Sequence, residues 1–439
     1  MIVLRRIPYW GVLALLIYMP FHIFLAQSVS LATGGLEVWK IAKDVVLGLL
    51  TLFTICLVVI DKKGNRLFYW LLGIGVAYFA IHALLWAVYP DLHQKSAILG
   101  IIYNTRLPAL LILGYGAALL YPKFVFSSIF KVVLGVSTVV AFLGVLQYFL
   151  PKDILTYVGY GLERGTRPAF FIDDNPALPR VMSTIREPNA LGAYLILPFA
   201  ALLAIGLRLR DNARRLLIGG MWLLHGLALL LTFSRSAWLG AALAVALVLW
   251  WQYKARIMPL CKRWWPLLVA TILLFTVVAF TQRNNEFVKS YVTHSTPEAV
   301  EDLDSNDLHW LLVREGIEGA IARPLGHGPG TAGIVSIQNG NGGFLTENYY
   351  VQIGYEVGII GLALLVAVSV VVYKALHGRH DYVGAVLLAG FWAYVLTNML
   401  LHTWSSEAVA TQWWLLASLA VLARVPKKIK SKAPKNVTT

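Results

Sequence analysis

The sequence has little charge for its length. Only 13% of its 439 residues are Asp, Glu, Lys or Arg, whereas 58% are hydrophobic. A soluble globular domain carries about 25% charged residues, so this composition excludes a chain built from soluble domains. Long apolar runs separated by short polar strips indicate transmembrane helices instead.

Cysteine is almost absent as well. The two residues present, Cys56 and Cys261, lie in or beside apolar runs, which excludes a disulfide framework and a cysteine-based metal site. The spacings His-x-His and Glu-x-x-His, which are typical of metal ligands, do not occur either. We therefore expect a protein that needs no metal ion and no other cofactor.

Twelve apolar segments are candidates to cross a bilayer, which takes about 20 apolar residues each. They lie near 10–27, 43–60, 67–89, 97–121, 125–150, 190–207, 216–233, 236–252, 266–281, 348–373, 382–401 and 408–423. The segment 266–281 is short, and Arg106 and Pro108 interrupt 97–121. No small-residue cleavage site follows the first segment, so it is expected to be a membrane helix and not a removed signal peptide. The prediction is an all-α, polytopic membrane protein of about twelve transmembrane helices, with residues 1–424 as its membrane domain.

Lysine and arginine are concentrated in alternate loops, which gives the orientation. With the N-terminus in the cytoplasm, the basic strips on that side are 61–66, 208–215, 254–263, 374–379 and the tail 425–439. Most acidic residues then fall outside, where two loops are long, about 151–189 and, between the ninth and tenth helices, 282–347. The net charge of +15 is thus a sign of topology and of contact with anionic lipid. It argues against a nucleic-acid partner.

Polar side chains gather in the external loops and at the ends of the spans beside them, whereas the rest of the chain has few. Several of these side chains are arginines. A guanidinium stays charged and makes bidentate contacts with phosphate, so converging arginines would form a clamp for a pyrophosphate leaving group. The candidates are Arg186, Arg235 and Arg314, with Arg106 as a deeper member inside a span. Each one taken alone is also compatible with an interfacial residue that reaches toward lipid headgroups.

Other polar residues accompany these arginines. Glu347 and Asn348 open the tenth span, and His402 flanks the last external turn. His327 lies in the Gly-Pro run 324–330, which is either an ordinary turn or the carrier of a base.

Several motifs, in their order and spacing, resemble the O-antigen ligase and O-antigen polymerase superfamily of bacterial membrane proteins. The resemblance covers about residues 125–424. It is carried by Arg186-Glu187-Pro188-Asn189-Ala190-Leu191-Gly192, Leu231-Thr232-Phe233-Ser234-Arg235-Ser236-Ala237-Trp238-Leu239-Gly240, Pro324-Leu325-Gly326-His327-Gly328-Pro329-Gly330 and Glu347-Asn348-Tyr349-Tyr350-Val351-Gln352-Ile353-Gly354-Tyr355-Glu356-Val357-Gly358-Ile359-Ile360-Gly361.

The resemblance implies a metal-independent, inverting glycosyltransferase of the inner membrane whose active site faces the periplasm. Its donor would be a glycan linked to undecaprenyl pyrophosphate, held by Arg186, Arg235 and Arg314. The acceptor would be another glycan or lipid A-core, and other polysaccharide-assembly proteins would be its partners. Membrane lipid would be a further contact of the protein.

The residue at position 347 distinguishes the two reactions that this resemblance allows, polymerisation of repeat units and ligation to lipid A-core. The ligases typically carry a histidine before the asparagine that opens the tenth span, and this chain carries Glu347 there. We therefore expect a polymerase of O-antigen or exopolysaccharide repeat units, with Glu347 as its catalytic base. Nearby arginines are expected to lower the pKa of Glu347. The simpler alternative to a catalytic role is that Glu347 stabilises the first turn of a helix capped by Thr346. An O-antigen ligase is the second possibility, and a transporter or flippase of lipid-linked glycan is the third.

Overall fold

The computed structural model describes residues 3–172, 175–281, 305–337 and 343–422. Within α9, beyond residue 259, it describes the course of the backbone but few side chains. The helices are α1 (Ile7–Tyr18), α2 (His22–Thr33), α3 (Leu36–Ile60), α4 (Arg66–Val88), α5 (Gln94–Leu120), α6 (Phe126–Phe149), α7 (Pro188–Gly206), α8 (Asn212–Leu231), α9 (Arg235–Thr281), α11 (Ser305–Ala322), α12 (Gly333–Ser336), α13 (Tyr349–His377), α14 (Tyr382–Leu400) and α15 (Glu407–Leu422). Strands β1 (Phe170–Ile172) and β2 (Asn175–Arg180) pair antiparallel.

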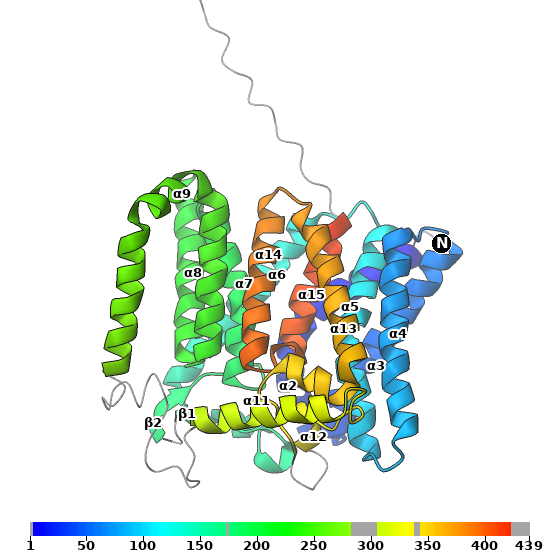
Figure 1. Ribbon diagram of the computed structural model, residues 1–439. Coiled ribbons are helices and arrows are strands. Elements are labelled where there is room, and N and C mark those ends of the chain that lie inside the picture. Colours follow the sequence, from blue (N-terminus) through cyan, green and yellow to red (C-terminus); the bar gives the residue numbers. More distant parts are fainter. Residues whose placement is uncertain (1–2, 173–174, 282–304, 338–342, 423–439) are drawn as a thin grey trace, which may run out of the picture.

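The expected all-α, polytopic membrane architecture is confirmed. Ten helical segments of the described chain are long and apolar enough to cross a membrane, and α15 is a shorter apolar helix of 16 residues. Helix α9 has 47 residues and turns back on itself at the end of the bundle away from α11 (Figure 1). Its returning half is the expected segment 266–281, whose side chains lie outside the described residues.

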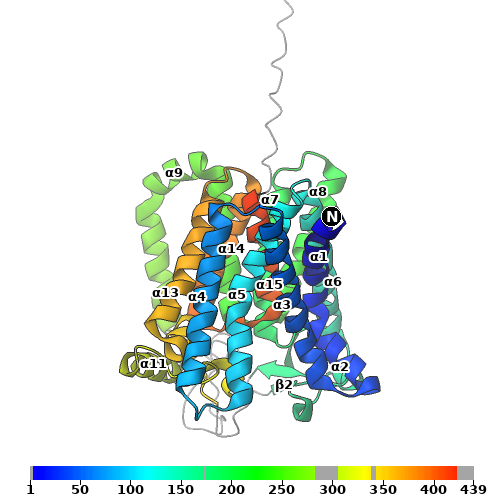
Figure 2. The same cartoon turned by 90° about the vertical axis from the view of Figure 1, so that its right-hand side faces the viewer.

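The centre of the bundle is formed by α5 and α15, which pack closely on each other (Figures 1 and 2). Trp413 and Trp414 of α15 are fully buried there. Helix α5 runs unbroken through Arg106 and Pro108, both of them buried. A proline removes one backbone hydrogen bond, and a buried charge needs a partner. The neighbouring helices supply that partner, as described below.

The described basic strips, 61–66, 208–215, 254–263 and 374–379, lie at the end of the bundle that holds the N-terminus (Figure 1). Arg5 Nε donates a hydrogen bond of 2.6 Å to Asp61 at the end of α3. The Arg208 guanidinium lies 5.3 Å from the Trp251 ring and 5.1 Å from the Tyr382 ring. The described basic strips therefore share one end of the bundle, as predicted, while the assignment of this end to the cytoplasm stays a prediction.

Helix α11 lies across the opposite end of the bundle, which we call the site end (Figure 1). There the Gly-Pro run 324–330 fits into a kink of α13 at Gly358, where φ is 69°. The backbone N–H groups of His327 and Gly328 donate to the carbonyl groups of Tyr355 and Glu356, each over 2.9 Å. Any side chain at Gly330 would collide with the Ser96 carbonyl oxygen, 2.0 Å from the position of an added Cβ. The run is a structural clasp between α5 and α13.

Candidate functional site

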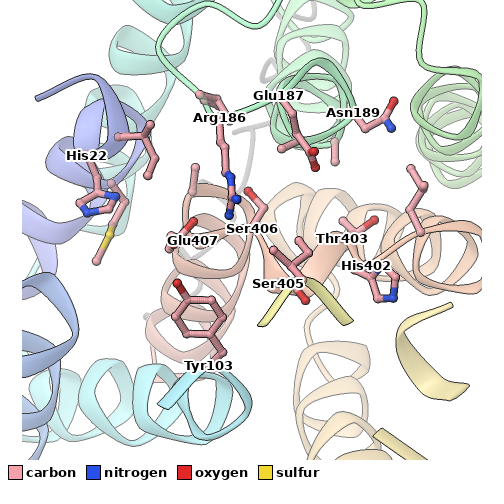
Figure 3. Close-up of a pocket in the computed structure, with 18 of the residues that line it drawn as sticks. His22, Tyr103, Arg186, Glu187, Asn189, His402, Thr403, Ser405, Ser406 and Glu407 are labelled. Atoms are coloured by element: carbon pink, nitrogen blue, oxygen red, sulfur yellow. The ribbon is translucent and has the colours of Figure 1, made fainter. Parts of the chain in front are cut away.

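Three adjoining cavities open at the site end. The central cavity, of about 160 Å³, lies between α7, the start of α15 and the kink that separates α1 from α2 (Figure 3). The α2–α3 cavity, of about 410 Å³, shares His22, Tyr103, Arg186 and Glu407 with it. The α9–α11 cavity, of about 510 Å³, shares Asn189, Glu347 and Leu401 with it.

Glu347 therefore stands between the central cavity and the α9–α11 cavity. Its backbone is in the left-handed region, with φ 50°, which costs a non-glycine residue about 1–3 kcal/mol and is most often found at functional sites. Asn348 caps α13: its side-chain oxygen accepts from the N–H groups of Tyr350 at 3.0 Å and Val351 at 3.1 Å. Its amide donates to the Met399 carbonyl over 3.0 Å. The cap thus comes from Asn348 and not from Thr346, and Glu347 precedes the helix.

Burial raises the pKa of the Glu347 carboxyl, and the charge of Glu187 raises it further. The expectation that arginines would lower this pKa is wrong. Desolvation disfavours the charged form of a carboxylate, and the negative charge of Glu187 acts in the same direction. A raised pKa makes a carboxylate a stronger base near neutral pH.

Arg186 points into the central cavity (Figure 3). Its side chain is half-buried and makes no hydrogen bond or ion pair with any residue that the structure describes. The segment before it is held firmly, because Thr184 Oγ1 donates to the Pro20 carbonyl over 2.8 Å and the Ser183 N–H donates to Gln147 over 2.8 Å. A rigid segment therefore presents an unpaired guanidinium to the cavity.

His22 is a second polar group without a partner beside this cavity. It is 1% exposed, and neither ring nitrogen has a hydrogen-bond partner among the described residues. It lines both the central and the α2–α3 cavities. A single histidine within the first apolar segment gave no sequence signal, because the kink that turns it inward, at Met19–Phe21, depends on packing.

The α9–α11 cavity combines two arginines with an apolar rim. Arg235 lines it, and so does Arg180, which donates to the Thr232 carbonyl over 2.9 Å and to Asn189 over 2.8 Å. The rim includes Leu239 and Trp310, whose exposed fractions are 55% and 67%. Arg180 was missed in the sequence because it lies inside the loop, away from the motifs, and the β1–β2 pairing brings it to the site.

Arg106 belongs to a closed network of charges beneath the cavities. Its guanidinium lies 3.0 Å from Asp44 and 4.0 Å from Glu407, and Lys43 lies 2.8 Å from Asp44 and 3.5 Å from Glu407. Arg106 contacts none of the three cavities, whereas Lys43 and Glu407 each line at least one. Its partners come from α3 and α15, which the sequence did not connect to it.

The remaining sequence candidates fall in different places. Arg314 lies on α11 with a 77% exposed side chain, pairs with Glu318 at 2.7 Å and lines none of these cavities. The His327 ring stacks on Tyr355 with a centroid distance of 3.9 Å, within the clasp. His402 lines the central cavity, where burial lowers its pKa to about 4. Arg186 and Arg235 thus face adjoining cavities that share Glu347, while Arg314 stands apart.

A metal site is not evident in the described part of the chain, where no group of three His, Cys, Asp or Glu side chains is arranged to hold an ion. The sequence also contains one Asp-x-Asp triplet, Asp302-Leu303-Asp304, which lies outside the described residues. Metal independence therefore stays a prediction.

Comparison with known families gives a match for one part of the chain. Residues 219–366 match the sequence model of the family described as O-antigen ligase. This region is similar to the O-antigen ligase family. The match confirms the resemblance to the O-antigen ligase and polymerase superfamily; it includes Arg235 and Glu347 and begins after Arg186. No curated protein sequence matches the chain.

Proposed function

We propose that this protein polymerises lipid-linked oligosaccharide repeat units. A glycan would leave undecaprenyl pyrophosphate and join a sugar hydroxyl on another lipid-linked unit, as in O-antigen or exopolysaccharide synthesis. The similarity of residues 219–366 to the O-antigen ligase family supports a glycosyltransferase of this general type. The donor, the acceptor and the direction of transfer are inferred from the site.

The α9–α11 cavity fits the donor. A lipid pyrophosphate has a long apolar tail and a doubly anionic head, and this cavity offers an apolar rim at Leu239 and Trp310 beside Arg180 and Arg235. Negative charge grows on the pyrophosphate as the glycosidic bond breaks, and fixed cations stabilise that charge in the transition state. Arginine contributes most when its planar fork contacts two phosphate oxygens at once.

The central cavity fits the acceptor sugar. Its lining mixes hydroxyl, carboxylate and imidazole groups, among them Ser406, Glu407 and His402 (Figure 3). Such groups hydrogen-bond to sugar hydroxyls. Arg186 also lines the central cavity, where its guanidinium would place a positive charge near Glu347 on the acceptor side.

The position of Glu347 between these two cavities carries the proposal. A sugar hydroxyl is a poor nucleophile until a base accepts its proton, and Glu347 faces the acceptor side and the donor side at once. Attack from the side opposite the departing pyrophosphate inverts the anomeric centre. No cofactor takes part in this scheme.

Deletion of the gene, followed by gel analysis of surface polysaccharide, tests the proposal. Loss of long chains with a single repeat unit retained is the result expected of a polymerase. Loss of all attached chains, with polymer accumulating on its lipid carrier, would identify a ligase instead. Accumulation of single units on the cytoplasmic leaflet would identify a flippase.

The ligase reaction is a second candidate because the matched family is described by that activity. The glutamate at position 347 favours the polymerase, since histidine is expected there in a ligase. The same gel separates the two.

We propose further that the site end faces the periplasm of a bacterial inner membrane. The basic strips at the other end support this orientation. Reporter fusions after Gly64 and Arg379 should give a cytoplasmic signal, and fusions within residues 151–189 a periplasmic one. The opposite pattern would exclude a periplasmic active site.

A further inference from the structure

A histidine from α11 approaches Glu347 inside the α9–α11 cavity. His309 Nδ1 lies 3.7 Å from Glu347 Oε2, and the two side chains are 25% and 26% exposed. Both line this cavity together with Arg235. The distance is within reach of an ion pair but too long for a hydrogen bond. Catalytic hydrogen bonds are often this long before substrate binds and shorten in the reacting complex.

We infer that His309 is a proton relay that takes the acceptor's proton from Glu347 and delivers it toward the departing pyrophosphate. The inference rests on the proposed function and adds a residue to it. His309 is suited to this path because Glu347 borders the acceptor cavity, whereas, of the three cavities described, His309 lines the one that holds Arg180 and Arg235.

The steps balance in atoms and charge. The acceptor hydroxyl forms the new bond to the anomeric carbon and loses its proton to the Glu347 carboxylate. The bond between the anomeric carbon and the pyrophosphate oxygen breaks, and the oxygen keeps the electron pair. Glu347 then passes the proton to the neutral His309 ring. The imidazolium adds a positive charge beside Arg235 and gives the proton to a pyrophosphate oxygen, which restores both side chains.

The surroundings bring the two groups closer in proton affinity. Burial and the charge of Arg235 lower the pKa of His309, so its ring is neutral and able to accept a proton near pH 7. Burial and the charge of Glu187 raise the pKa of Glu347. A proton moves between two groups most readily when their pKa values are similar.

Charged and titratable groups face this pair from several elements. Arg180 is the last residue of β2 and Arg235 the first residue of α9, and both line the same cavity. Glu187 precedes α7, and His402 follows α14. Arg235 favours a neutral His309 before reaction, and both arginines favour an anionic leaving group after it.

Purified protein in detergent, supplied with lipid-linked oligosaccharide extracted from a strain lacking the gene, provides the test. The variants are His309→Gln, which cannot carry a proton, and His309→Ala, which leaves space for a small molecule. The matched control is His380→Gln, because His380 is an exposed histidine between α13 and α14 at the opposite end of the bundle. We expect a loss of about 10²-fold in turnover for both His309 variants and none for His380→Gln. Imidazole in the buffer should restore turnover to His309→Ala in proportion to its concentration and leave His309→Gln unchanged.

The outcomes separate the relay from its alternatives. Wild-type turnover by His309→Gln would overturn it, and so would a loss that imidazole does not restore while the thermal midpoint stays normal. Loss of folded protein in both variants would show that His309 holds α11 in place, which also overturns the relay. If His309 is dispensable but Glu347→Gln is inactive, the relay fails and the proposed transfer stands. If the wild-type protein transfers nothing, the proposed function itself fails.

Discussion

Arg106 contacts Tyr103, and Arg186 lines a cavity with it, but the two arginines differ in their surroundings. Arg106 is 2% exposed, stacks at 4.5 Å on the Tyr103 ring and pairs with Asp44. Arg186 borders the same cavity wall as Tyr103 and has no hydrogen-bond or ion-pair partner in the described part of the chain. The first arginine is enclosed by the fold, and the second faces a cavity.

This difference separates structural from functional charge. A buried ion is tolerated only when its partners are also buried, so a satisfied network holds α3, α5 and α15 together. A half-buried guanidinium without a partner is uncommon, since buried polar groups are usually hydrogen-bonded. The energy that Arg186 does not gain within the protein is available for an anionic substrate.

The largest effect on stability is expected from Arg106→Met. It removes one cation of the network and leaves Asp44 and Glu407 with Lys43 alone, which should cost about 3–5 kcal/mol of folding free energy. The measurement is the thermal midpoint and the amount of folded protein in detergent. A normal midpoint would show that the network is not what holds these helices.

Arg186→Ala and Arg235→Ala are expected to spare the fold and lower turnover by about 10²–10³-fold, because each removes a fixed cation, Arg235 from the donor cavity and Arg186 from the central cavity. Lysine at either position should restore activity only in part, since it offers a point charge and no fork. The assay is transfer of lipid-linked oligosaccharide by well-inserted protein. Full activity of Arg235→Ala would remove it from the donor site.

The pH dependence of turnover should reveal Glu347. As a base it must be ionised, and its pKa lies above the ordinary 4.5. Turnover should therefore fall as the pH is lowered through this raised pKa. A pH–rate profile of wild-type protein checks this, and Glu347→Asp should keep an acid limb. A profile that is flat from pH 7 down to the ordinary value of glutamate would contradict the assignment.

The smallest effect is expected from Arg314→Ala. This arginine was the third member of the predicted clamp, but its side chain is exposed and paired with Glu318 one helical turn away. Exposed pairs of this kind contribute little, so turnover and thermal midpoint should both stay near wild type. A large loss of turnover at normal protein levels would restore Arg314 to the site.

Much of the architecture follows from local signals that the sequence displays directly. Apolar runs of membrane length and the alternation of basic strips were sufficient for the all-α polytopic fold. The role of the Gly-Pro run could not be predicted in this way, because the kink at Gly358 that it fills depends on the packing of α13. Short motifs identified Arg186, Arg235 and Glu347, since polar residues stand out in an apolar chain.

Contacts between distant segments could not be deduced in the same way. Arg180, His22 and His309 carry no motif and reach the site through β2, a kink before α2 and α11. The direction of the pKa shift of Glu347 also required the structure, because it is set by burial and by the neighbouring Glu187.

Transfer by Glu347→Gln tests the central claim most directly. Glutamine keeps the size of the side chain and its hydrogen-bonding oxygen but cannot accept a proton. Purified wild-type and variant protein, at equal amounts and with equal thermal midpoints, would be supplied with the same lipid-linked oligosaccharide. The account predicts that the variant turns over about 10²-fold more slowly or worse. Near-normal polymer from Glu347→Gln would contradict it.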